Sequence, residues 1–265
     1  EFLLWAAALR GDAQFAATLS PLNPRERPAY ESWKALSAML GLPVTFEAGE
    51  APGASLPELL AGARAVVSTS VAEGFGLAFL EPFAAGRPAA GRNLPEITGD
   101  FIEAGMNLDA LYDRLAVPAD WVDSGTLRGK VAAALRAQRL AYGLPCGTAD
   151  EDRALQSMRS GDTLDFGRLD EELQGGIIRK IGRAPELARH MAPAALEARL
   201  PAPCTIARNR ELVLSGYGPE RYAQRLEEAY GRILDDAGPA GVREFSESRL
   251  IGQFNEPERL FLLRA

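Results

Sequence analysis

Cysteine and histidine are scarce in this sequence. Its 265 residues include two cysteines and one histidine. Cys146 and Cys204 are too few for a disulfide framework and lack the paired spacing of a zinc site. His190 follows Arg189 in a helical segment and has no ligand partner, so we assign it to the surface or to packing. This use of cysteine predicts a reducing compartment, and we expect the protein to be cytoplasmic.

Long apolar runs and an excess of basic residues are also missing. The longest apolar stretches, such as residues 2–9, are far shorter than a membrane-spanning helix. The formal net charge of −7 and the isoelectric point near 5.0 argue against broad capture of nucleic acid or of an anionic membrane. We therefore expect neither a nucleic-acid partner nor a transmembrane segment.

The remaining composition is that of a globular protein. Hydrophobic residues make up 47% of the chain and charged residues 25%, enough apolar material for a substantial core in one or two domains. The chain has no initiator methionine, and Glu1–Leu9 has the pattern of an apolar helix. Because domains seldom begin inside an element, we expect the chain to be the C-terminal part of a longer protein.

Short strand-like runs alternate with helix-like segments through about residue 100, which is the pattern of βαβ units. The predicted strands are residues 15–19, 43–47, 65–69 and 87–90. The predicted helices between them are residues 29–40, 56–61 and 76–85. Three successive strand-then-helix units predict an α/β fold with a Rossmann-like, doubly wound parallel sheet in residues 1–145.

Helical patterns dominate beyond about residue 119. The predicted helices are residues 127–142, 169–181, 186–199 and 219–234. Residues 147–165 are polar and charged, which predicts a linker or an excursion from the fold. We therefore assign residues 146–265 to an appended, mainly helical region that includes a closing helix at 219–235.

A glycine turn between two acids is the most informative motif. Ala65–Thr69 is a small apolar run typical of a buried central strand, and Gly74 and Gly76 follow it before a helix. Free N–H groups at the start of a helix suit a diphosphate, because the helix dipole also favours negative charge. Glycine lets the backbone approach such a ligand closely. At the carboxyl end of a parallel sheet, this pattern predicts a nucleotide-sugar site.

The two acids are spaced to contact different parts of one ligand. Glu73 lies in the turn, and Glu81 lies five residues beyond Gly76, roughly 7.5 Å along a helix that rises 1.5 Å per residue. This separation fits sugar hydroxyls at Glu73 and ribose hydroxyls at Glu81. Pro82 lacks the N–H that would bond the carbonyl of Ala78, which predicts a kink or an irregular first turn.

These residues resemble glycosyltransferase family 4, whose GT-B fold carries an E-x7-E element in its C-terminal, donor-binding domain. The element corresponds to Glu73–Glu81, and Pro82–Pro88 is similar to the continuation seen in the family. Gly91–Ile97 looks like the next loop of the family, and Tyr217–Tyr230 looks like its closing helix. The resemblance covers two stretches, residues 1 to about 110 and 205–236.

The resemblance implies a retaining, metal-independent glycosyltransferase that moves a hexosyl group from a nucleoside-diphosphate sugar to an acceptor, with no further cofactor. Glu73 would be the catalytic residue, in contact with the donor sugar, and Glu81 would hold the donor ribose. The donor-binding residues implied are Gly74, Phe75, Gly76, Leu77 and Glu81. Further candidate donor contacts rank below these, because they are assigned mainly from their position. They are Phe46, Glu47 and Ala48, near the base of the nucleotide, and Ser70 and Arg92.

Some parts of the family pattern are absent from this chain. The Arg and Lys that neutralise the leaving diphosphate in the family would lie before Glu1, as would the acceptor-binding N-terminal domain. We therefore expect the chain to bind donor but to transfer sugar poorly by itself, with the missing N-terminal domain as its partner.

Three alternatives remain open. A non-catalytic Rossmann-like module for regulation or subunit assembly would keep the fold without binding a donor. A nicotinamide oxidoreductase is less well supported, because Leu19-Ser20-Pro21 stands where G-x-G-x-x-G would follow the first strand. Asp150-Glu151-Asp152 matches the D-x-D pattern of GT-A enzymes, although acids in such a polar run are usually solvated.

Overall fold

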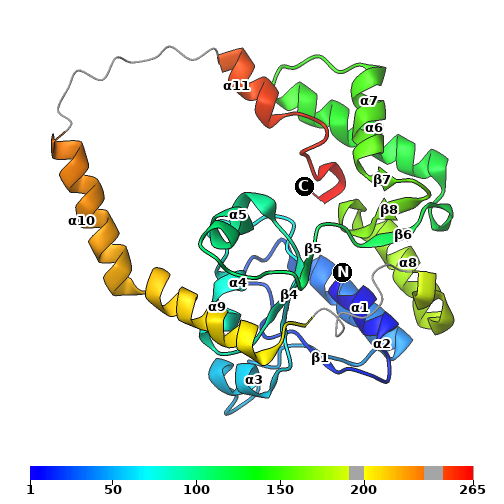
Figure 1. Cartoon of the computed structure of the whole chain (residues 1–265). Helices are drawn as coiled ribbons and strands as arrows, with labels where there is room; N and C mark the ends of the chain where they lie inside the picture. The colour runs from blue at the N-terminus through cyan, green and yellow to red at the C-terminus, as the bar shows by residue number, and fades with distance from the viewer. Residues whose placement is uncertain (191–199, 236–246, 265) are drawn as a thin grey trace.

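The computed structural model describes residues 1–190, 200–235 and 247–264. Helices and parallel strands alternate through its first 112 residues, as the sequence pattern predicts (Figure 1). The elements of this part are α1 (Phe2–Ala8), β1 (Phe15–Ala16), α2 (Arg27–Leu40), β2 (Val44–Thr45), α3 (Leu56–Gly62), β3 (Val66–Ser68), α4 (Leu77–Ala84), β4 (Ala89–Arg92), α5 (Pro95–Glu103) and β5 (Leu111–Tyr112).

The second half of the described chain is richer in helix but also contains strands. Its elements are β6 (Ala116–Pro118), η1 (Ala119–Trp121), α6 (Ser124–Ala141), α7 (Thr148–Ser157), β7 (Arg159–Ser160), β8 (Thr163–Asp165), η2 (Phe166–Arg168), α8 (Glu171–Arg183), η3 (Pro185–His190), α9 (Pro203–Gly216), α10 (Pro219–Asp235), α11 (Glu247–Phe254) and η5 (Leu262–Arg264). The η elements are 3₁₀ turns.

Helix ends are set by local chemistry that can be recognised in the sequence. The Asp123 side chain accepts a hydrogen bond of 2.7 Å from the Thr126 N–H at the start of α6, which satisfies one of the donors that a helix start leaves unpaired. Gly41 ends α2 in a left-handed conformation, with φ of 58°. These signals explain why the predicted helices at 29–40 and 127–142 agree closely with α2 and α6.

The parallel strands form two sheets, in the orders β1-β2 and β3-β4-β5, where the sequence predicted one continuous doubly wound sheet. The predicted α/β class with parallel pairing is confirmed. The β1-β2 pair is short, because the backbone of Glu47 turns to a left-handed φ of 57° just after β2 and ends the extended run.

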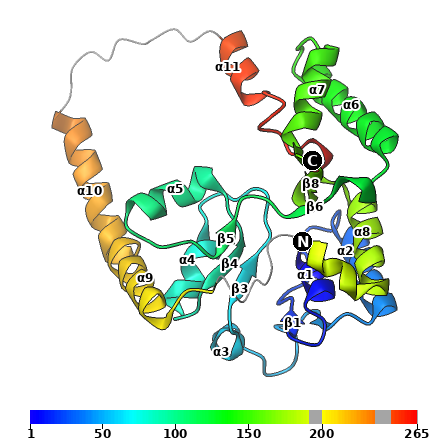
Figure 2. The same cartoon turned by 45° about the vertical axis from the view of Figure 1, so that its right-hand side comes forward.

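The sheet β3-β4-β5 is covered on both faces (Figure 2). Alternate residues of a strand point to opposite faces, and β4 shows this directly. Ala89 packs into the cluster built on α4, α5 and α9, whereas Ala90 packs into the larger cluster that contains α1 and α8. Burial on both faces is the property that the small apolar run of β3 and β4 predicts.

The prediction of a linker at residues 147–165 was wrong. This stretch forms α7 and the β7-β8 hairpin, and β8 also pairs with β6 to complete an antiparallel sheet. Ala154, Met158 and Leu164 supply its buried side, with exposed fractions of 4% or less. Most of the other side chains are polar and face outward. The average polarity of the stretch therefore gives no sign of its buried face.

One buried cluster contains residues from both sides of position 145, where the sequence placed a boundary between regions. It includes Leu4 of α1, Leu135 of α6 and Ile177 of α8. Helix α8 packs against α1 and α2, so the later helices complete the core of the first part. The region after 145 also holds two strands of the antiparallel sheet.

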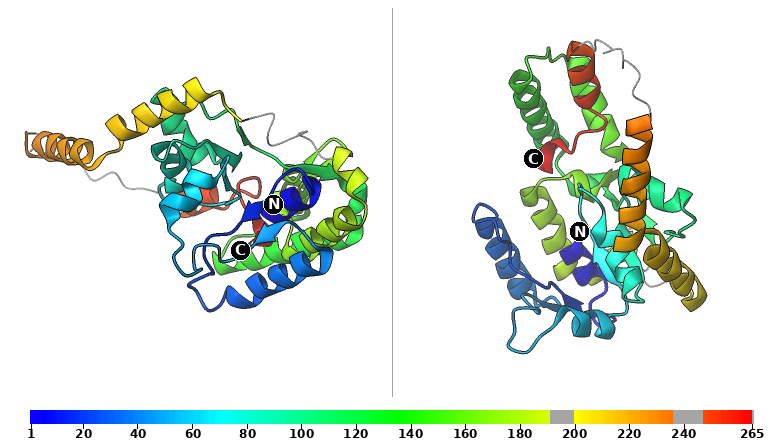
Figure 3. Two further views of the ribbon diagram at one scale, coloured as in Figure 1. Left: turned by 90° about the horizontal axis from the view of Figure 1, so that it is seen from below. Right: turned by 90° about the vertical axis from the view of Figure 1, so that its left-hand side faces the viewer.

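Helix α10 matches the helix predicted at 219–235, but it projects away from the rest of the described chain (Figures 1 and 3). None of its residues is buried, and Tyr222, Tyr230 and Ile233 are each more than half exposed. It therefore does not pack as a closing helix on the described residues. The helix predicted at 186–199 begins as η3, and residues 191–199 lie outside the described part.

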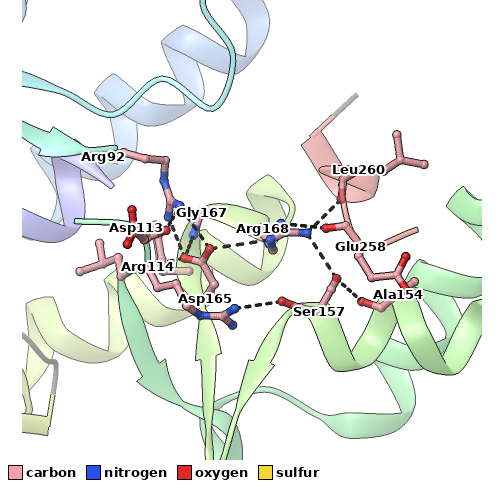
Figure 4. Close-up of polar contacts among 12 residues, drawn as sticks. Arg92, Asp113, Arg114, Ala154, Ser157, Asp165, Gly167, Arg168, Glu258 and Leu260 are labelled. Atoms are coloured by element: carbon pink, nitrogen blue, oxygen red, sulfur yellow. Dashed lines mark hydrogen bonds and ion pairs between the residues drawn. The ribbon is translucent and has the colours of Figure 1, made fainter. Parts of the chain in front are cut away.

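A buried ion pair connects β4 to β8 (Figure 4). Arg92 ends β4 and is 1% exposed, and its Nη2 lies 2.7 Å from Oδ1 of Asp165 at the end of β8. The same guanidinium contacts the carboxylate of Glu1 and donates 2.9 Å to the backbone carbonyl of Asp113. This network joins α1, the parallel sheet and the antiparallel sheet.

The charges of the network are well satisfied. The Asp165 carboxylate also accepts hydrogen bonds of 3.2 Å from the N–H groups of Leu115 and Gly167. Burial disfavours the charged form of Arg92, but the carboxylates of Glu1 and Asp165 outweigh this and raise the pKa of Arg92 above its ordinary value. Removal of one partner from such a pair leaves a buried charge uncompensated.

Arg168 connects the last described segment to the same region (Figure 4). Its guanidinium donates to the carbonyls of Leu260 at 3.1 Å and Glu258 at 3.2 Å, and it lies 4.5 Å from the ring centre of Phe261. The segment that follows α11 is thus attached to η2.

No helix in the described ranges is both long enough and apolar enough to cross a membrane.

Substitution of Asp165→Ala should lower the free energy of unfolding by about 3 kcal/mol, because Arg92 loses a buried counter-charge and two backbone N–H groups lose their acceptor. Urea unfolding followed by circular dichroism measures this change. Asp162→Ala, at an exposed position of the same hairpin, is the control and should change stability little. Equal effects of the two substitutions would contradict a structural role for the ion pair.

Candidate functional site

The candidate site begins at the carboxyl end of β3. Strand β3 pairs in parallel with β4, and Ser68 lies opposite Gly91. A Cβ atom at Gly91 would lie 2.0 Å from the carbonyl oxygen of Ser68, so only glycine allows this close approach. The contact fixes where β3 ends and therefore where the following turn starts.

Gly76 occupies the most restricted position of the turn. Its φ is 86°, and it is the residue that precedes the first turn of α4. A Cβ atom at this position would lie 2.3 Å from Cγ2 of Ile97 and 3.2 Å from the ring of Phe101. The turn is therefore held against α5, and Phe101 in turn contacts Tyr217 edge-on at 5.4 Å between ring centres.

The start of α4 is irregular, although the bond concerned is not the one that Pro82 removes. The N–H of Phe79 donates 2.9 Å to the carbonyl of Gly76, three residues back, instead of the four-residue spacing of an α-helix. Pro82 itself lies inside the helix and is buried. The N–H groups of Leu77 and Ala78, the first two of the helix, make no backbone hydrogen bond among the described residues and are available for another acceptor.

Helix α4 separates a buried side from an exposed side. Phe79, Leu80 and Phe83 are 3% exposed or less. Leu77 and Glu81, one helical turn apart, both face solvent, and Leu77 is 53% exposed. The side that carries the predicted donor contacts is thus the accessible side.

The carboxylates of the two acids in the E-x7-E element are unpaired among the described residues. Glu73 is half-buried in the turn and Glu81 is exposed on α4. Among the described residues, neither side chain makes a hydrogen bond or an ion pair. Phe75 between them is 61% exposed, an unusual position for a large aromatic side chain. The turn therefore combines two free carboxylates, an exposed ring and glycine backbone.

The loop at residues 46–48, which was predicted to contact the base of the nucleotide, makes its contacts with other residues. The carboxylate of Glu47 accepts 2.8 Å from Nζ of Lys34, and Phe46 contacts Tyr30 edge-on at 5.7 Å. Burial, followed by the charge of Glu47, raises the pKa of Tyr30. Ala48 is half-buried beside them. In the described chain, no hydrogen bond, ion pair or ring contact joins this loop to residues 73–81.

The two arginines that follow α4 in sequence are bound to other parts of the protein. Arg92 is buried in the ion pair with Asp165, which gives it a structural role in place of the donor contact predicted for it. Arg87 donates from Nε to the carbonyl of Leu60 at 2.9 Å and contacts the carbonyl of Ala61. Ser70, which follows β3, is half-buried.

Sequence reasoning missed two polar residues at neighbouring strand ends. Asn93 directly follows β4 and Asp113 directly follows β5, and Nδ2 of Asn93 donates 2.7 Å to Oδ1 of Asp113. Carboxyl ends of parallel strands meet at one edge of a sheet, where open α/β proteins bind ligands. Polar residues immediately after two predicted strands were the signal that could have identified them.

The acids of the D-x-D alternative make hydrogen bonds and ion pairs at the start of α7. Asp150 accepts 3.2 Å from the N–H of Gly147 and pairs with Arg153, which lowers the pKa of Asp150. Asp152 pairs with Arg128 at 3.0 Å. These acids stabilise the first turn of α7. Within the described ranges no group of three or more His, Cys, Asp or Glu side chains converges.

Comparison with known protein families, characterised proteins and solved structures finds no match to this chain. Its function must therefore be argued from its own residues. The structure places Glu73, the glycine turn and Glu81 on one continuous turn and helix. It leaves Phe46–Ala48 on another loop and Arg92 in the core.

Substitution of Gly76→Ala should destabilise the protein by about 2–4 kcal/mol, because a Cβ atom would occupy a left-handed conformation and overlap Ile97. Gly74→Ala is the matched control two residues away, since a Cβ atom there meets no atom within 4 Å. Thermal unfolding of both variants measures the difference. Similar melting temperatures for the two would show that the turn is not held against α5.

Proposed function

We propose that this chain is the donor-binding part of a retaining glycosyltransferase of the GT-B type, similar to family 4. The observation that carries the proposal is the turn between β3 and α4. There, Glu73 lies without a partner in the turn, and Gly76, which tolerates no side chain, leads into a helix whose exposed side presents the unpaired Glu81. The resemblance of residues 73–88 to the family motif supports the same assignment.

Each part of the turn has a task in this proposal. The backbone from Gly74 to Leu77 receives the diphosphate, because N–H groups at a helix start attract negative charge. Glu81 accepts hydrogen bonds from the ribose hydroxyls, and Glu73 accepts them from the hydroxyls of the transferred hexose. Rate enhancement would come from positioning and from stabilising charge on the leaving phosphate. No nucleophile from the protein is needed.

The exposed apolar side of α10 supports a further part of the proposal, an acceptor-binding domain as partner. Tyr222, Leu226, Tyr230 and Ile233 are 37–68% exposed along one helix. Apolar residues repeated on one side of a helix normally pack against another surface. The proposal places the acceptor on that additional domain and the whole enzyme in the cytoplasm.

A non-catalytic module is the second candidate function, and one observation favours it. Arg87 and Arg92, which follow the turn and α4 in sequence, both bind acceptors of the protein itself. A transferase that lacks metal needs positive charge to stabilise its leaving diphosphate. If this charge is not supplied by another domain, the chain keeps the fold without the reaction.

A thermal-shift screen with UDP-glucose, GDP-mannose and ADP-glucose should identify one donor that raises the melting temperature. A ligand at 100 times its dissociation constant stabilises the folded state by about 2.7 kcal/mol. Glu81→Gln should raise the dissociation constant for that donor at least about tenfold, equivalent to about 1.4 kcal/mol, because a carboxylate acceptor for the ribose is lost. Isothermal titration calorimetry measures the change.

Glu103→Gln is the control, since it removes an exposed acid at the end of α5 outside the turn. Absence of binding by all three sugar nucleotides would argue for the non-catalytic module, and donor binding that resists Glu81→Gln would contradict the placement of the donor ribose at Glu81.

A further inference from the structure

A cavity of about 560 Å³ lies beside β5, between the end of α5 and helix α9. Its volume falls in the range of small-molecule sites. Its walls combine polar side chains with the apolar groups of Met106, Leu108 and Leu111. The function proposed above makes no use of it.

One wall presents the carboxylate of Asp113 in a fixed orientation. Oδ1 of Asp113 accepts 2.7 Å from Nδ2 of Asn93, and Oδ1 of Asn93 accepts 2.6 Å from the hydroxyl of Thr98. Thr98 is fully buried. A carboxylate only accepts hydrogen bonds, so the amide nitrogen of Asn93 must point to Asp113, and the amide oxygen is left to accept from Thr98.

A second aspartate of the lining, Asp109, is supported in a similar way. Oδ2 of Asp109 accepts 2.7 Å from Nδ2 of Asn107. The backbone of Asn107 is held by Asn209 of α9, which accepts 3.0 Å from its N–H and donates 2.7 Å to its carbonyl. Asn209 is 0% exposed.

Burial of a polar side chain is unfavourable unless hydrogen bonds compensate it. Thr98 and Asn209 are two such buried groups, and each one orients an asparagine that orients a carboxylate of the cavity. One oxygen of each aspartate is taken by this support, and the other accepts no hydrogen bond from the described residues. Pre-oriented acceptors of this kind lower the entropic cost of binding a ligand.

We propose that this cavity binds a carbohydrate. Asp109 and Asp113 supply acceptors for hydroxyl groups, and Arg208 supplies guanidinium donors from the neighbouring helix. Ile102, which also lines the cavity and is 52% exposed, offers an apolar surface for the C–H face of a sugar ring. Asn93 and Asp113 follow β4 and β5, so this part of the lining lies at the same sheet edge as the turn after β3.

The mixed charge of the lining favours a sugar over a metal ion. Arg208 lies in the same cavity as the two carboxylates and would repel a cation. The amide oxygens of Asn93 and Asn107, which could ligate a metal, already accept hydrogen bonds from the Thr98 hydroxyl and the Asp109 N–H. The proposal is independent of donor binding at Glu73 and Glu81.

Isothermal titration with maltose and cellobiose tests the proposal. At least one disaccharide should bind with a dissociation constant in the millimolar range. Asp109→Asn combined with Asp113→Asn should weaken it at least about tenfold, equivalent to about 1.4 kcal/mol, while the melting temperature stays unchanged. Each asparagine keeps an oxygen for its partner amide, so the fold should persist.

Glu96→Gln combined with Glu103→Gln removes two exposed acids of α5 outside the cavity and should leave sugar binding unchanged. Failure of both disaccharides to bind the folded protein would overturn the proposal. Binding that is lost in Glu81→Gln but kept in the double aspartate variant would overturn it too, because the sugar would then occupy the turn. Calcium binding that depends on Asp109 and Asp113, without sugar binding, would identify a cation site instead.

Discussion

The contact between Gly76 and Ile97 is the constraint on which the proposed donor site depends. It holds the turn after β3 against α5, so the first N–H groups of α4 and the two acids keep one arrangement. The contact of Gly91 with Ser68 lies just before the turn, at the end of β3, and sets the spacing of β3 and β4. Neither contact tolerates a methyl group. A turn fixed in this way can present a preformed surface to a ligand, which reduces the entropy lost on binding.

The buried pair of Arg92 and Asp165 holds the surrounding architecture together. It connects the parallel sheet to the antiparallel sheet, and residues on both sides of position 145 share the core around it. The same pair removes Arg92 from any contact with a ligand. Stability and chemistry therefore use different residues here: the arginine is structural, while the carboxylates of Glu73 and Glu81 remain free. Positive charge for a leaving diphosphate would have to come from elsewhere, which is the reason that the proposal includes a partner domain.

Local signals in the sequence predicted much of the fold. Helix α2 follows from its apolar period and from Gly41 at its end. Features that depend on distant partners could not be predicted in this way. Residues 147–165 are polar on average, and their buried face exists only because β8 pairs with β6. Arg92 looked like a phosphate contact because its counter-charge, Asp165, lies 73 residues away in the chain. The cavity beside β5 could not be predicted for the same reason, because Asn209, which holds the backbone of Asn107, lies 102 residues away from it in the chain.

Amide chemical shifts measured during titration with a nucleotide sugar test the central claim most directly. If the turn after β3 is the donor site, the largest shifts should fall on the backbone N–H groups of residues 74–77, with smaller changes near Glu81. Shifts confined to other surfaces, or their absence at residues 74–77 when the donor is saturating, would contradict the account and leave the chain as a Rossmann-like module without a donor site.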